Sequence, residues 1–227
     1  MDEGKILIVK LSKGKIGDYN ANLLGMIIIG KLLVGALERE DLDEKLRRPF
    51  YLYIDEFQNF LTDGINIILS EARKYKLALT MGHQFLGQLT RANNNTKIRD
   101  AVFGNVGNKA IMRVGEDDAA FLKKVVEGPF EESDLQQLPN VTAVIKLLVE
   151  GKPTPPFTVR SFYGESPYDL ISPYNKELAN TIKQISRLKY GRDINIVENE
   201  IKQRGTFIKE KKDENKGGGL GDFGFGF

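Results

Sequence analysis

Two adjacent carboxylates follow an apolar run in this chain. Asp55 and Glu56 come directly after Phe50–Ile54, five aromatic and aliphatic residues typical of a strand in a sheet. Open α/β sheets bind their ligands at the carboxyl ends of the strands. Two acids are costly to place there without a partner. A hydrated Mg²⁺, which one or two carboxylates and phosphates usually hold, is a suitable partner.

An apolar strand that ends in Asp-Glu has the pattern of a Walker B box. Asp55 would hold the hydration shell of a Mg²⁺ that bridges two phosphates. Glu56 would polarise the attacking water as a general base. The dipeptide by itself favours a plainer interpretation, a capping Asp beside a surface Glu, because such pairs are common.

Two polar groups on neighbouring elements favour the chemical interpretation. The next expected strand ends at His83 and Gln84, so in a parallel sheet Gln84 would emerge beside the two acids. An amide there can bond both a water and a γ-phosphate. His83, the single histidine, is expected to be structural. Arg73, at the end of the helix before this strand, could act as an arginine finger on a neighbouring subunit or only stabilise the helix terminus.

Alternating apolar runs and helical patterns predict the elements that position these residues. The fold class is α/β, with a mostly parallel sheet covered by helices and an antiparallel hairpin at its edge. The helix over residues 21–40 is apolar nearly all round at its start and should be well buried. Further helices are expected over about 65–72, and at 85–89, 98–103, 116–126 and 131–138. Strands are expected at residues 5–11, 50–54, 77–82, 109–114, 141–149 and 157–162.

The composition indicates three parts. Residues 1–165 have the alternating α/β pattern, and residues 166–205 indicate a helical extension with amphipathic spacing. Residues 206–227 are charged and then rich in glycine and phenylalanine, which predicts a disordered tail.

Charge and cysteine content limit the partners only mildly. The net charge of +2 neither requires nor excludes nucleic acid. The absence of cysteine excludes disulfides and thiolate metal sites. The most apolar stretch, residues 23–37, is shorter than the roughly 20 residues a bilayer span needs and contains Lys31, so we expect a core helix and no membrane span.

Several stretches together resemble the HerA/FtsK-type DNA-pumping ATPases, and the closest branch is the coupling proteins of conjugation and type IV secretion. The resemblance covers about residues 4 to 162, and the combination of motifs is more specific than any one of them. It implies a RecA-like P-loop NTPase core, ATP and Mg²⁺ as cofactors, a hexameric ring, and ATP-driven movement of DNA with type IV secretion or conjugation components. The stretches that carry it are residues 51–58, 69–75 and 80–86, with 5–14 and 103–115 in support.

The resemblance also assigns roles to individual residues. Asp55 would bind Mg²⁺ through water, and Glu56 would be the catalytic acid in the nucleotide site. Gln84 would sense the γ-phosphate, and Arg73 would act in trans. DNA phosphates could meet the basic residues around an asparagine-rich loop, although a solvated loop explains them equally well; these residues are Arg91, Lys97 and Arg99.

One departure from the family is serious. A P-loop reads G-x-x-x-x-G-K-[ST], and the sequence has no such string. We therefore expect the C-terminal half of a longer ATPase, a fragment or a split gene product, which is inactive without a P-loop-bearing half. Its expected location is the cytoplasm, at the inner face of the membrane if a preceding segment or a partner anchors it.

Two other function classes remain open. The chain could be a non-catalytic RecA-like assembly or adaptor module that no longer binds nucleotide, which the missing P-loop favours. A Mg²⁺-dependent nuclease is the weaker alternative, because the sequence offers no third acid at a strand end.

Overall fold

The structure is a computed structural model that describes residues 1–61, 69–90, 96–161 and 175–204. The chain divides into two compact units, Met1–Tyr163 and Gly164–Phe227, and each is described by itself. The expected disordered tail, residues 206–227, lies outside the described residues.

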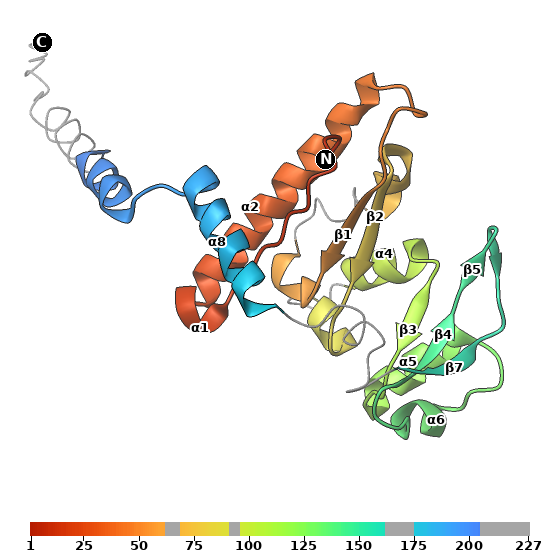
Figure 1. Ribbon diagram of the computed structural model, residues 1–227. Helices are drawn as coiled ribbons and strands as arrows, with labels where there is room; N and C mark the ends of the chain where they lie inside the picture. The colour runs from red at the N-terminus through yellow and green to blue at the C-terminus, as the bar shows by residue number, and fades with distance from the viewer. Residues whose placement is uncertain (62–68, 91–95, 162–174, 205–227) are drawn as a thin grey trace, which may run out of the picture. The chain divides into compact units, whose positions relative to one another are not determined.

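A two-stranded parallel sheet forms the centre of the first unit. β1 (Phe50–Ile54) pairs with β2 (Leu77–Met81) in register from Phe50↔Leu77 to Ile54↔Met81 (Figure 1). Two backbone bonds extend the pairing by a residue, from Gly82 N to the Ile54 carbonyl (2.9 Å) and from Phe57 N to the Gly82 carbonyl (3.0 Å). Both strands were expected from the sequence, and their carboxyl ends lie at the same edge.

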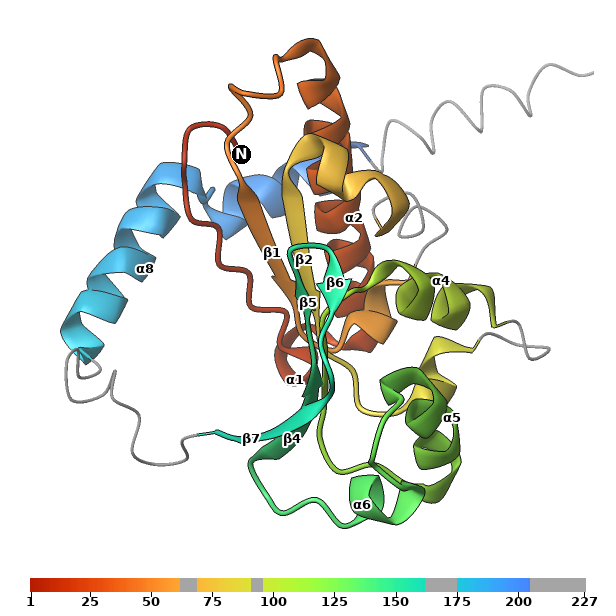
Figure 2. The ribbon, with the colours of Figure 1, turned by 90° about the vertical axis from the view of Figure 1, so that its right-hand side faces the viewer.

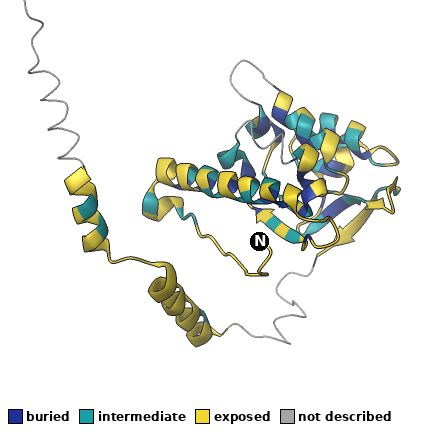
Figure 3. Cartoon of the chain, turned by 90° about the horizontal axis from the view of Figure 1, so that it is seen from above, coloured by how far each residue is buried: buried dark blue, intermediate teal, exposed yellow. Residues whose placement is uncertain are grey.

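A long apolar helix runs along this pair of strands. α2 (Asp18–Leu37) is followed by the 3-10 helix η1 (Glu38–Asp41) (Figure 2). Ile29 and Ala36 of α2 are buried in the same core cluster as Ile54 of β1. The remaining surface of α2 is largely exposed (Figure 3), so the expectation that this helix is well buried is wrong. The exposed large side chains include Leu23, Leu24, Ile27 and Val34.

The same helix is longer than the apolar stretch that the sequence indicated. Among the described residues, Asp18–Asp41 is the one helix long and apolar enough to cross a membrane, with a mean hydropathy of 1.7 over its best window. Length and composition alone are weak evidence, since core helices of soluble proteins meet the same criterion.

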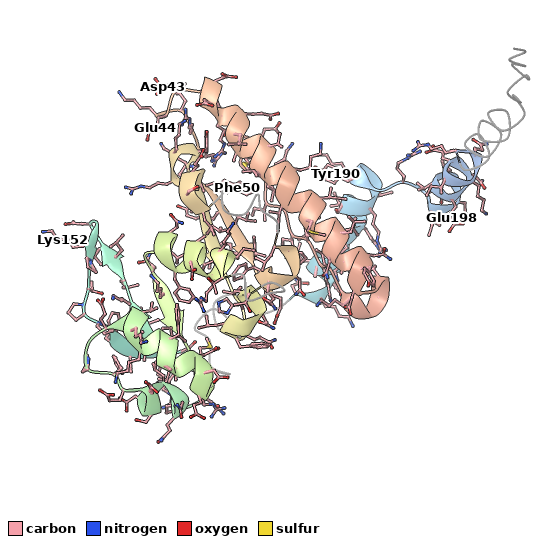
Figure 4. The ribbon with its side chains drawn as sticks, turned by 180° about the vertical axis from the view of Figure 1, so that it is seen from behind. Asp43, Glu44, Phe50, Lys152, Tyr190 and Glu198 are labelled. Carbon is pink, nitrogen blue, oxygen red and sulfur yellow. The ribbon has the colours of Figure 1, made fainter. Side chains whose placement is uncertain are left out.

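The second sheet of this unit is antiparallel. β3 (Lys109–Ile111), β4 (Thr142–Lys146) and β7 (Phe157–Arg160) pair in the order β3-β4-β7. A small hairpin of β5 (Leu148–Val149) and β6 (Lys152–Pro153) connects β4 to β7, with Lys152 near its tip (Figure 4). The expected hairpin is confirmed, but the mostly parallel sheet is not: β1 and β2 are the only parallel pair in the described part of the chain.

The first apolar run does not form the expected strand. Residues 5–11 have no regular secondary structure, and Ile6 and Ile8 are 89% and 87% exposed. An apolar β-branched run is compatible with a strand, but a strand also needs a partner edge, which this run lacks among the described residues.

Three short helices complete the first unit near their expected positions. They are α4 (Lys97–Asn105), α5 (Glu116–Val126) and α6 (Glu132–Gln136). α5 and α6 bury Val126 and Leu135 against Val144 of β4, which closes the core on this side.

Two buried arginines fix the turn that leads into β2. Arg39 Nη1 donates to the Tyr75 carbonyl at 2.8 Å, and Arg47 Nη1 donates to the Lys74 carbonyl at 2.7 Å. Both acceptors belong to the 3-10 helix η3 (Ala72–Tyr75). Arg39 is 1% exposed, and it also forms an ion pair with Asp2: its Nη2 lies 2.8 Å from Asp2 Oδ1, and its Nε donates to Asp2 Oδ2 at 3.4 Å.

The second unit is helical where it is described. α8 (Lys176–Tyr190) begins at Asn175, whose side chain accepts a bond from Leu178 N at 2.9 Å. A further helix covers residues 194–204. Leu178, Ile182 and Ile185 share one side of α8 and are all exposed, so this helix is amphipathic, as its sequence indicated.

Candidate functional site

The three residues expected to form an ATPase site lie together. Asp55 and Glu56 follow β1, and Gln84 follows β2 two residues after the pairing ends. Gln84 Nε2 donates to Glu56 Oε1 at 2.6 Å. The parallel register therefore brings the amide to the acid across the sheet edge, as the sequence pattern predicted.

The backbone of Glu56 has an uncommon conformation. Its φ of 50° and ψ of 44° lie in the left-handed region, which costs a non-glycine residue about 1–2 kcal/mol. Local bonds hold it there. Asp55 Oδ1 accepts from Glu56 N at 3.0 Å, and the Asn59 side-chain and backbone amides both donate to the Glu56 carbonyl at 3.0 Å. In this conformation the Glu56 side chain meets the Gln84 amide.

A second glutamine, which the sequence did not single out, also contacts the acid. Gln58 belongs to the 3-10 helix η2 (Phe57–Phe60), and its Nε2 donates to Glu56 Oε2. Each carboxylate oxygen of Glu56 thus accepts a bond from one glutamine amide. The spacing of two residues in a tight turn was the available signal for this contact, and the backbone between them starts from the left-handed Glu56.

Asp55 could provide one carboxylate ligand to a metal ion that is held mainly by phosphates. Its side chain is exposed, and Oδ1 is used by Glu56 N, while Oδ2 makes no hydrogen bond to the described residues. No cluster of three or more His, Cys, Asp or Glu occurs in the described ranges. A single available carboxylate fits a hydrated Mg²⁺ bound mainly through phosphates, and does not fit an all-protein cage.

His83 lies beside the site but points into the protein. Its ring packs on Phe57, with centroids 5.4 Å apart, and its Nδ1 is buried without a hydrogen-bond partner among the described residues. Burial lowers the pKa of His83, and its own backbone bond and the carboxylates of Asp118 and Glu56 raise it in part. These contacts agree with the structural role expected for this histidine.

A lysine from the N-terminal segment reaches the same turn. Lys13, in α1 (Lys13–Ile16), donates from Nζ to Asn59 Oδ1 at 3.0 Å. Since Asn59 also bonds the Glu56 carbonyl, the basic turn after residues 5–11 is tied to the acid. No local sequence pattern indicates this contact, because it joins residues 46 positions apart.

Arg73 does not join the site within one chain. It is exposed on η3, before the amino end of β2, whereas Gln84 follows the carboxyl end. The five residues of β2 alone separate the two by roughly 17 Å, at about 3.3 Å per residue. Its guanidinium makes no hydrogen bond or ion pair to the described residues, and it lies in the last turn of η3, where the expected role at a helix terminus stays open beside the role toward another subunit.

The candidate DNA contacts are only partly described. Arg91 lies outside the described residues, and Lys97 begins α4. Arg99 Nη2 lies 3.2 Å from Asp100 Oδ1, and its guanidinium lies 4.8 Å from the Phe121 ring centre. These contacts tie Arg99 to α4 and α5 within the chain.

The site lies in a stretch of the chain that matches a known protein family. Residues 49–126, well under half of the chain, match the family model described as "TraM recognition site of TraD and TraG". The resemblance to coupling proteins is thus confirmed for this segment. We call residues 49–126 the coupling-protein segment; it contains Asp55, Glu56 and Gln84. No curated protein matches the sequence.

Two solved structures resemble the chain at low sequence identity. The bacterial conjugative coupling protein TrwBdeltaN70, in an unbound monoclinic form, has a TM-score of 0.47 and 16% identity over 61% of this chain. VirB4 of Thermoanaerobacter pseudethanolicus has a TM-score of 0.48 and 16% identity over 70% of this chain. The chain spans 38% and 41% of the lengths of these two proteins, well under two thirds of either.

Proposed function

We propose that this chain is the C-terminal part of an ATP-driven, DNA-translocating motor of conjugative transfer or type IV secretion. The observation that carries the proposal is the meeting of Asp55, Glu56 and Gln84 at one edge of a parallel strand pair, inside the coupling-protein segment. Asp55 would hold Mg²⁺ through water, Glu56 would activate the attacking water, and Gln84 would read the γ-phosphate.

The phosphate-binding part of such a site must come from another segment. The sequence has no P-loop, and bound ATP would supply the phosphoryl group that is transferred. The small parallel sheet supports this view, because both its outer edges lack a partner strand among the described residues. A RecA-like core would be complete once a P-loop-bearing half adds strands to it.

The proposed partners follow the family description. A component of the TraM kind would dock on the coupling-protein segment, as that description says of TraD and TraG. DNA would run along basic groups near α4, and subunits would assemble in a ring, where exposed Arg73 could reach a neighbour's nucleotide.

ATP hydrolysis by a joined protein tests the proposal. The chain is fused after, or co-expressed with, a P-loop-bearing half of a coupling protein, and ATP hydrolysis is measured with and without DNA. We expect DNA-stimulated hydrolysis from the joined protein and none from the chain alone. A joined protein that folds and binds ATP but does not hydrolyse it would instead favour the non-catalytic assembly module.

A further inference from the structure

We propose that Gln58 is a positioning residue, which fixes the carboxylate of Glu56 for water activation. The inference rests on the proposed function, because it concerns the acid assigned there as the base. Gln58 touches neither a phosphate nor the attacking water in this role, and it acts only through Glu56.

The direction of the hydrogen bond is determined by chemistry. Gln58 Nε2 faces Glu56 Oε2, and a carboxylate oxygen only accepts. Turning the amide over would place Gln58 Oε1 against Glu56 Oε2, two acceptors in contact. The donor assignment therefore does not depend on distinguishing nitrogen from oxygen in the side chain.

The element that carries Gln58 is firmly anchored. Its neighbour Phe57 is 2% exposed, and Phe57 N donates to the Gly82 carbonyl of the β2 end. On the other side, Asn59 bonds the Glu56 carbonyl through both of its amide groups. Gln58 therefore contacts Glu56 from a turn that is fixed to both strands.

The side-chain oxygen of Gln58 is placed at a cost to stability, which supports a functional role for this residue. Gln58 Oε1 is buried and has no hydrogen-bond partner within the described ranges. A buried acceptor left without a partner is unfavourable, and such groups call for a reason beyond stability. Holding Glu56 through the other end of the amide is such a reason.

The two glutamines differ in how they can move. Gln84 is exposed, and its backbone N donates to Gln88 Oε1 at 3.2 Å. A Gln84 side chain that turns from Glu56 toward a γ-phosphate leaves Glu56 Oε1 without this bond and open to accept a hydrogen bond from water. Gln58 is half-buried on the anchored turn and remains on Oε2, so the carboxylate keeps its orientation when Gln84 leaves.

Side-chain amide signals of the full chain test the contact without nucleotide. In ¹⁵N-labelled protein, the Gln58 amide protons are expected to shift upfield in Glu56→Ala and to exchange with water at least about tenfold faster. In Gln84→Leu they should stay unchanged, and Gln136, half-buried on α6, serves as the reference in both variants. Unchanged Gln58 signals in Glu56→Ala would overturn the proposal, as would equal shifts in both variants.

Kinetics of the joined protein test the role. Gln58→Leu should lower kcat by about 10- to 100-fold, the usual effect of a misplaced catalytic group, while KM for ATP changes by less than about twofold. The isosteric Gln58→Glu should lose at least as much, since it has no donor and faces a like charge. Gln136→Leu should match the parent.

The outcomes separate the two proposals. A parental kcat in Gln58→Leu overturns the positioning role, even if the amide contact is present. A parental kcat in Glu56→Gln overturns the proposed function instead, whatever Gln58 does. A rise in KM with unchanged kcat would assign Gln58 to nucleotide binding, which also contradicts positioning.

Discussion

Replacing Arg39 by methionine probes the buried contact that fixes the start of β2. The change keeps an apolar stem but removes the charged donor to the buried Tyr75 carbonyl, at 2.8 Å, which costs about 1.5–3 kcal/mol. The lost ion pair adds less than about 1 kcal/mol, because the Asp2 side chain is 46% exposed. We expect Arg39→Met to lower the free energy of unfolding by about 2–4 kcal/mol.

Urea unfolding followed by far-ultraviolet circular dichroism measures this effect. Arg48→Met is the matched control, since Arg48 is exposed, and it should change the free energy of unfolding by less than about 0.5 kcal/mol. Asp2→Asn should cost less than about 1 kcal/mol. An Arg39→Met protein as stable as the parent would refute the reasoning. The free energy gained by no longer burying a charged guanidinium would then equal the free energy lost with its two contacts.

Further predictions concern the packing of α2 and the state of His83. A Cβ on Gly25 would lie 2.2 Å from Phe60 Cε1, so Gly25→Ala should destabilise by about 1–3 kcal/mol. Gly30, with nothing within 4 Å, gives the matched variant Gly30→Ala, which should stabilise by about 0.4–1 kcal/mol; equal effects in urea unfolding would contradict the packing. Burial lowers the pKa of His83, so the imidazole binds a proton more readily in the unfolded chain than in the folded one. The contribution of neutral His83 to stability is therefore present above about pH 6.5 and is lost as the pH falls below it. The free energy of unfolding of His83→Gln should therefore fall less than that of the parent between about pH 7 and about pH 5. Equal falls of the two proteins in urea unfolding over this pH range would contradict this.

Local sequence patterns predicted the elements whose stability is largely local. α5 begins with three acids and has apolar residues at helical spacing, and it forms at its expected bounds, Glu116–Val126. The strand pair is also recovered, because the strand pattern and the parallel connection determine which edge receives Asp55, Glu56 and Gln84. Their proximity follows from topology, so it needed no knowledge of side-chain geometry.

Features that depend on distant partners were not predictable in the same way. Residues 5–11 have a strand composition but no pairing edge among the described residues, and α2 has an apolar surface that no described segment covers. β4 runs antiparallel to both of its neighbours, β3 and β7, which makes the second sheet antiparallel. The contact of Gln58 with Glu56 follows a left-handed backbone at Glu56, a conformation that glutamate adopts rarely and that the sequence does not mark.

Single-turnover ATP hydrolysis by the joined protein tests the central claim most directly. We expect Glu56→Gln to bind Mg²⁺-ATP as tightly as the parent and to hydrolyse it about 10²- to 10⁴-fold more slowly, the usual contribution of a general base. Glu116→Gln, an exposed acid at the start of α5, should behave as the parent. A Glu56→Gln protein that hydrolyses bound ATP at the parental rate would contradict the assignment of this edge of the sheet as half of an ATPase site.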